Sequence, residues 1–70
     1  MNKKYIVEFV FSDNYIGVAT EVKAETAELA LNQAQGMLHG EWVNIIAPDG
    51  YTIRIRPEKV VAIKIVEEID

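Results

Sequence analysis

Two arginines in the second half of the chain are the residues best suited to chemistry. Arg54 and Arg56 are two positions apart, so in an extended strand their side chains lie on the same face. The hairpin register derived below sets Asn44 opposite Arg54 and Trp42 opposite Arg56. A planar amide, an indole ring and two guanidinium groups can together hold a planar or phosphorylated ligand, or contact a protein partner. The alternative is a purely structural role, in which the arginines stack across the strands and form exposed ion pairs with acids such as Glu8 or Glu21.

The other polar residues match no catalytic or metal-binding pattern. His39 is the single histidine, and Glu41 follows two residues later without any spacing motif. A metal site needs more ligands than this, and nucleophilic catalysis needs a partnered base. The densest acids, Glu67, Glu68 and Asp70, have the pattern of a solvated tail. Because the chain also has no glycine-rich phosphate loop and no catalytic triad order, we expect no enzymatic activity, no metal and no cofactor.

Composition restricts the class of protein further. Seventy residues make one domain over positions 1–70, near the lower size limit for a core without disulfides or metals. The absence of cysteine predicts a reducing, cytoplasmic location. No apolar run approaches the ~20 residues of a membrane helix, and an alternating strand follows the basic start where a signal peptide would be apolar. A net charge of −4 disfavours general binding to nucleic-acid backbones.

Alternation of apolar and polar residues predicts a strand over residues 4–11. Asp13 and Asn14 form the expected two-residue turn, because both tolerate positive φ. The resulting register pairs Phe11 with Ile16, Phe9 with Val18, Val7 with Thr20 and Tyr5 with Val22. Every apolar position then faces an apolar or β-branched one, which supports this pairing.

Residues 26–39 form the predicted helix. Thr26 is the expected N-cap. The apolar stripe consists of Ala27, Ala30, Leu31, Ala34, Met37 and Leu38. Gly36 weakens the helix and is expected to allow close approach to the sheet. His39 is expected in the last turn and Gly40 just after the cap.

A three-strand meander is expected after the helix. The Pro-Asp-Gly sequence at 48–50 fits a three-residue hairpin loop, with glycine in the left-handed position. This loop pairs Ala47 with Tyr51, Ile45 with Ile53 and Val43 with Ile55. A two-residue loop would instead set isoleucine and valine against the two arginines. Residues 57–59 then turn the chain into a last strand over 60–67, with Val61, Ile63 and Ile65 on its core face.

The apolar surface of the predicted sheet exceeds what one helix can cover. Five strands at ~4.8 Å spacing make a sheet more than ~20 Å wide, whereas a helix is ~10 Å across. The sheet either curls into a partial barrel, bending at Gly17, or copies of the chain associate. We favour self-association through the last strand, which is apolar on both faces. The expected self-association contacts are Val60, Ala62 and Val66, and Lys64 joins Trp42, Asn44, Arg54 and Arg56 as an expected ligand or partner contact.

The sequence therefore predicts an α+β fold of order ββαβββ, a four- to five-stranded, mostly antiparallel sheet with one helix packed on one face. The predicted function is a small non-enzymatic protein-interaction module that self-associates and binds a partner protein, as a bacterial or phage accessory or inhibitor protein would. The alternative is an oligomer that sequesters a small anionic ligand or nucleotide through Arg54, Arg56 and Trp42. A third hypothesis, binding of single-stranded nucleic acid, needs several exposed aromatics beside basic groups, and this acidic chain does not meet that need.

Overall fold

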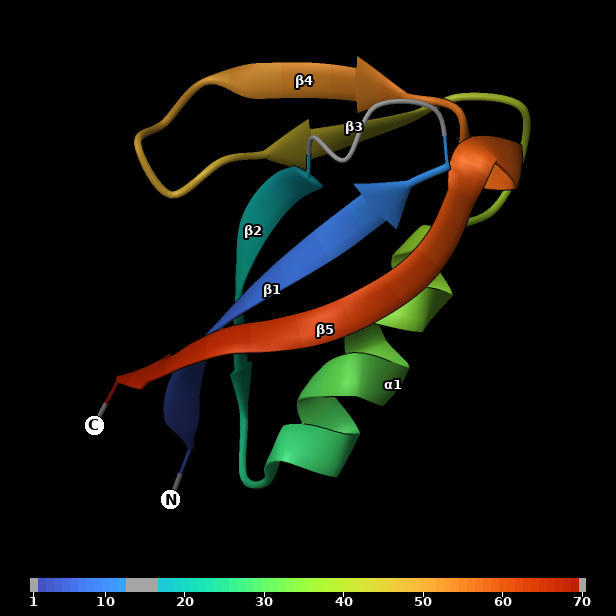
Figure 1. Cartoon of the computed structure of the whole chain (residues 1–70). Helices are drawn as coiled ribbons and strands as arrows, with labels where there is room; N and C mark the ends of the chain where they lie inside the picture. The colour runs from blue at the N-terminus through green and yellow to red at the C-terminus, as the bar shows by residue number, and fades with distance from the viewer. Residues whose placement is uncertain (1, 13–16, 70) are drawn as a thin grey trace.

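The computed structural model describes residues 2–12 and 17–69 of the chain. Within these ranges the elements are β1 (Lys3–Phe11), β2 (Gly17–Ala24), α1 (Ala27–Met37), β3 (Val43–Ile46), β4 (Thr52–Ile55), a 3-10 turn (Pro57–Lys59) and β5 (Val60–Ile69) (Figure 1). This order confirms the predicted ββαβββ arrangement and the α+β fold class. None of the described helices is long and apolar enough to cross a membrane.

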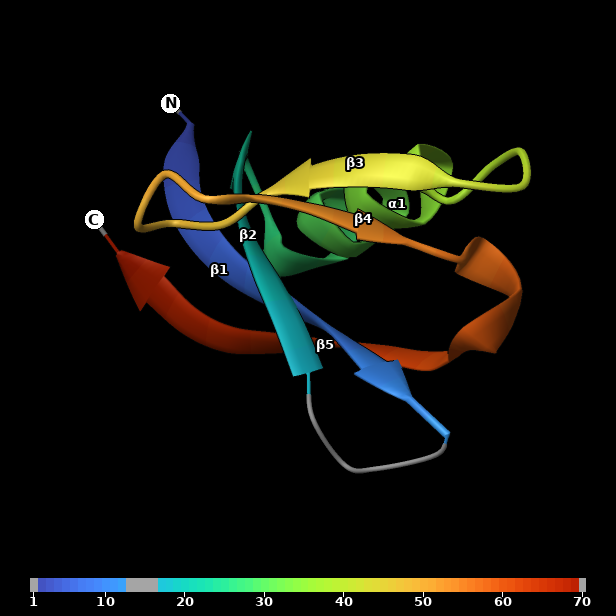
Figure 2. The same cartoon turned by 90° about the horizontal axis from the view of Figure 1, so that it is seen from above.

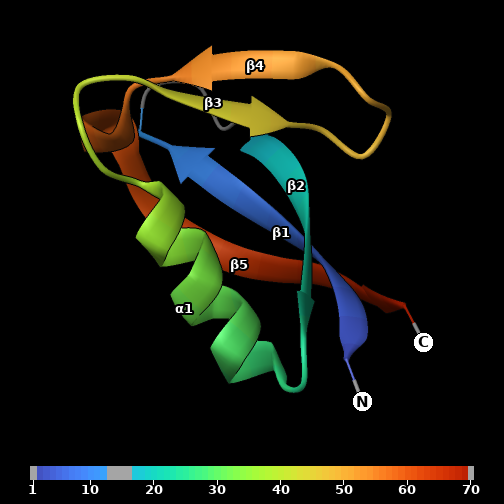
Figure 3. The ribbon, with the colours of Figure 1, turned by 180° about the vertical axis from the view of Figure 1, so that it is seen from behind.

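The described strands divide between two antiparallel sheets. One is three-stranded with the order β2-β1-β5, and β3 and β4 form a two-stranded sheet of their own. The predicted meander is therefore correct for β3 and β4 but wrong for β5, which pairs with β1. Helix α1 lies on one face of the three-stranded sheet, and the hairpin of β3 and β4 crosses the end of that sheet (Figures 2 and 3).

The register between β1 and β2 agrees with the prediction. Phe9 pairs with Val18, Val7 with Thr20 and Tyr5 with Val22. The predicted pair of Phe11 with Ile16 and the turn at Asp13 and Asn14 lie outside the described residues. This register turns three apolar residues of β1 toward the helix, where they form the centre of the core: Tyr5, Val7 and Phe9.

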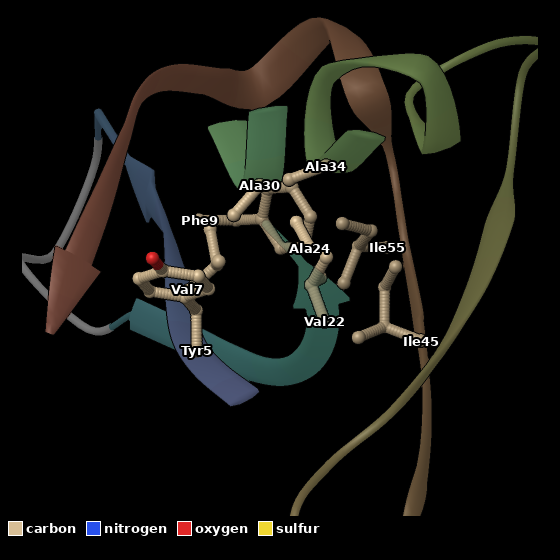
Figure 4. Packing of buried hydrophobic residues seen from close by; sticks show 9 residues of the cluster. All are labelled: Tyr5, Val7, Phe9, Val22, Ala24, Ala30, Ala34, Ile45 and Ile55. Carbon is tan, nitrogen blue, oxygen red and sulfur yellow. The ribbon is translucent and has the colours of Figure 1, made fainter. Parts of the chain in front are cut away.

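The core lies between the three-stranded sheet, the helix and the inner face of the hairpin. Its buried residues are Tyr5, Val7, Phe9, Val22, Ala24, Ala30, Ala34, Ile45 and Ile55 (Figure 4). Ala30 and Ala34 are the fully buried residues of α1, and their small side chains let the helix lie close to β1. Ile45 and Ile55 come from the hairpin, so the second sheet completes the core that one helix leaves open.

The start of the helix confirms one sequence prediction and corrects another. The Oγ1 atom of Thr26 accepts a hydrogen bond from the backbone N–H of Leu29 at 3.2 Å, so Thr26 is the N-cap. The expectation that Gly36 allows close approach to the sheet is wrong. A Cβ at Gly36 would meet no atom within 4 Å, because this position is exposed on the solvent side of the helix.

The helix ends earlier than the sequence predicts. Leu38 is the C-cap, and its backbone N–H donates to the carbonyl of Gln35 at 3.1 Å. His39 therefore lies beyond the helix, and the expected position in the last turn is wrong. Gly40 has φ of 79°, the left-handed conformation expected of it, but it lies two residues after the cap.

Strand β5 departs from simple alternation at two irregularities in its ladder with β1. Register shifts leave Val61 and Val66 without a partner on β1, as in β-bulges. As a result, Val60 packs against the core and Val61 is exposed, which reverses the faces that the sequence predicts for these two residues. Ile63 and Ile65 pack against the core as predicted.

Candidate functional site

The hairpin of β3 and β4 is closed by the predicted three-residue loop. The backbone N–H of Ala47 donates to the carbonyl of Tyr51 at 2.8 Å, and the N–H of Gly50 donates to the carbonyl of Ala47 at 2.9 Å. Gly50 has φ of 96°, which a residue with a Cβ rarely adopts. The pairs Val43–Ile55, Asn44–Arg54 and Ile45–Ile53 follow. This register decides which side chains share a face of the hairpin.

The two faces of the hairpin have opposite environments. The inner face gives Ile45 and Ile55 to the core. The other face, which we call the outer hairpin face, carries Trp42, Asn44, Ile46, Thr52, Arg54 and Arg56, and all but the half-buried Arg56 are exposed. Ile46 is absent from the sequence-predicted contacts, although alternation with Asn44 and Trp42 was a sufficient signal for it.

Arg54 is oriented without being neutralised. Its Nε donates to the Oδ1 atom of Asn44 at 3.0 Å, the cross-strand pairing predicted from the register. Among the ion pairs of residues 2–12 and 17–69, none involves Arg54. The bond to Asn44 draws the guanidinium across the hairpin toward β3, so its charge is available at the surface.

Arg56 forms contacts of the kind expected for the structural alternative. Its guanidinium carbon lies 5.2 Å from the centroid of the Trp42 ring, a cation–π distance. Its terminal nitrogen also lies 2.7 Å from a carboxylate oxygen of Glu58. The expected partners Glu8 and Glu21 are wrong, because they belong to the other sheet and pair with lysines there.

Lys64 does not join the arginines. It lies on β5 opposite Glu8, and its Nζ is 3.3 Å from a Glu8 carboxylate oxygen. The Glu8 side chain in turn lies over Gly17, where a Cβ would collide with it. Lys64 therefore belongs to the face of the three-stranded sheet opposite α1. The residues predicted as self-association contacts are split, since Ala62 and Val66 are exposed on β5 while Val60 packs against the core.

An open groove of about 640 Å³ runs between β3, β2 and the end of the helix. Its lining includes Thr20, Glu21, Met37, His39 and Val43. Of the candidate ligand-binding residues on the hairpin, Asn44 lines the groove, whereas Trp42, Arg54 and Arg56 lie outside it. This groove was not predictable from residue patterns, because it depends on how the hairpin crosses β2.

The described residues include no group of three or more His, Asp or Glu side chains placed to hold a metal ion. Comparison of the chain with protein-family models, curated proteins and solved structures finds no match. Function is therefore inferred from the surface of the molecule alone.

Proposed function

We propose that this chain is a small, non-enzymatic module that self-associates and binds a partner protein through the outer hairpin face. The observation that supports this most directly is the combination of a half-exposed Trp42 (52%) with Arg54, which Asn44 orients and which forms no ion pair with a described residue. Tryptophan and arginine are the residues that most often dominate the energy of protein interfaces. Because Asn44 already fixes the Arg54 guanidinium, binding loses less side-chain entropy there.

The charge of the face favours an acidic partner surface. The chain has a net charge of −4, yet Arg54 on the outer hairpin face forms no ion pair with a described residue, whereas Arg56 is paired with Glu58. Opposite charge on a partner speeds association and disfavours wrong partners. An acidic, cysteine-free chain of this size fits an accessory or inhibitor protein of a bacterium or phage acting in the cytoplasm, which is the class of role that we propose.

Self-association is assigned to β5. Val61 (64% exposed), Val66 (56% exposed) and Ala62 present apolar side chains on this edge strand. The two register irregularities bend β5, which disfavours a continuous ladder between copies, so side-chain contacts rather than backbone pairing join the copies. Light scattering at high micromolar concentration should give a mass above 7.9 kDa that falls in Val66→Lys. A monomer mass for the unchanged chain would contradict this part of the proposal.

A small anionic ligand is the second candidate for the same face. It is favoured by the terminal nitrogens of Arg54, which form no ion pair with a described residue. A thermal-shift screen with phosphate and nucleotides tests it. A stabilising shift that disappears in Arg54→Ala supports the candidate, and a shift that persists in that variant rejects it.

Affinity capture with matched variants tests the main proposal. The bait proteins are the unchanged chain, Trp42→Ala, Arg54→Ala and the control Leu29→Ala. Leu29 lies on the helix and is 45% exposed, an exposed fraction similar to the 52% of Trp42. The control therefore removes an exposed apolar side chain away from the hairpin. We expect one protein to be captured by the unchanged chain and by Leu29→Ala but not by the two hairpin variants. Equal capture by all four would reject the outer hairpin face as the contact surface.

A further inference from the structure

The outer edge of β3 carries backbone groups that its ladder with β4 does not use. The bond from Ala47 to Tyr51 identifies their pair as hydrogen-bonded, so the backbone groups of Ile46 and Asn44 point away from β4. The carbonyl of Ile46 accepts a bond from Thr20 Oγ1 at 2.9 Å, which shows that this edge faces β2. The ladder with β4 does not use the N–H of Ile46 or either backbone group of Asn44.

The groove beside this edge has the chemistry of a strand-binding site. Met37, Val43 and Ile45 give it an apolar lining, and Glu21 is its one carboxylate among the described residues. No lysine or arginine of residues 2–12 and 17–69 lines it. An apolar side chain is therefore favoured in the groove, and an acidic one is disfavoured there by Glu21. On the opposite side of β3, the Arg54 guanidinium is drawn toward the same edge by Asn44.

We infer that an extended segment of the partner protein adds to the outer edge of β3 as a third strand of the hairpin sheet. Side chains of a strand alternate between its two faces. The segment therefore places apolar side chains in the groove and acidic side chains on the outer hairpin face, within reach of Arg54. Backbone hydrogen bonds supply affinity in this mode and the alternating side chains supply specificity. This inference rests on the proposed function, since it names the partner's chemistry at the outer hairpin face.

A designed peptide tests the chemistry of the segment. The probe is a capped peptide of about eight alternating valine and glutamate residues, and the control replaces each glutamate with lysine. The chain is acidic overall, so non-specific attraction favours the lysine peptide. Tighter binding of the glutamate peptide, measured by shifts of backbone amide resonances in residues 43–47, supports the inference. Tighter binding of the lysine peptide, or no binding of the glutamate peptide at about 1 mM, overturns it.

Removal of a backbone N–H, first in the chain and then in the peptide, tests strand addition itself. Asn44→Pro removes the outward N–H, which the ladder with β4 does not use, and Asn44→Ala removes the same side chain but keeps that N–H. We expect the glutamate peptide to bind Asn44→Pro about fivefold more weakly than Asn44→Ala. Peptides N-methylated at alternate amides give a second test on the unchanged chain. Methylation of the amides that point toward β3 should abolish binding, and methylation of the amides that point away from β3 should leave binding unchanged.

Equal binding to both Asn44 variants and to both methylated peptides overturns strand addition. Failure of the inference differs from failure of the proposed function. If Trp42→Ala and Arg54→Ala lose the captured protein while the peptides do not bind, only strand addition is overturned. If only one of the two methylated peptides binds, but Trp42→Ala and Arg54→Ala still capture the partner protein, the outer hairpin face is rejected as the partner-binding surface.

Discussion

The role of the hairpin in the core is best tested by replacing Ile45 with alanine. Ile45 is 2% exposed and packs in the core, whereas its neighbour Ile46 is 64% exposed on the outer hairpin face. Truncating a buried isoleucine to alanine costs about 2–5 kcal/mol in the free energy of unfolding. A domain of this length has a free energy of unfolding of roughly 4–10 kcal/mol, so Ile45→Ala removes a large share of it. The control Ile46→Ala should cost less than about 1 kcal/mol, because its side chain is already solvated.

Urea unfolding followed by two probes measures this difference. Circular dichroism reports all elements, and the fluorescence of Trp42 reports the start of the hairpin. In Ile45→Ala we expect the fluorescence transition to move to lower urea than the dichroism transition, because the hairpin loses its anchor first. In Ile46→Ala the two transitions should stay together near those of the unchanged chain. Equal destabilisation by the two alanine variants would refute the assignment of the hairpin faces.

Three further experiments use the same urea titration. Gly36→Ala should raise the free energy of unfolding by up to about 1 kcal/mol, because the new Cβ enters open space on a helix; a loss of stability would contradict this. Thr26→Ala should cost about 1 kcal/mol by leaving the Leu29 N–H without its cap, and Thr26→Ser should restore most of it; an unchanged midpoint in Thr26→Ala would show that the cap contributes nothing. A double-mutant cycle on Glu8 and Lys64 should give a coupling below about 1 kcal/mol, since Lys64 is largely exposed; a larger coupling would mean that the pair is effectively desolvated.

The parts of the fold that depend on neighbouring residues could be predicted from the sequence. The loop at 48–50 allows one register that pairs apolar residues with each other, and this register places Arg54 beside Asn44. The N-cap at Thr26 follows from its hydroxyl group just before an apolar stripe. These features depend on contacts within one helical turn or one hairpin, where residue type and spacing restrict the geometry strongly.

The parts that depend on distant pairing could not be predicted in the same way. β5 is apolar on both faces, so its pattern is compatible with pairing to β4 as well as to β1. Its bulges exchange the faces of Val60 and Val61. The alternation of apolar and polar residues does not predict a bulge where the strand contains no glycine. The separation of Lys64 from Arg54 and Arg56 follows directly from that pairing. The arrangement of Trp42, Asn44, Arg54 and Arg56 within the hairpin was therefore predictable, whereas the position of Lys64 was not.

Mapping of backbone amide resonances on addition of the captured partner tests the central claim most directly. The claim is that the partner binds the outer hairpin face. It predicts that the largest shifts occur at residues 42–46 and 52–56 and that those of residues 60–69 and 27–37 remain small. Largest shifts on β5 or on α1, with the hairpin resonances unmoved, would contradict it.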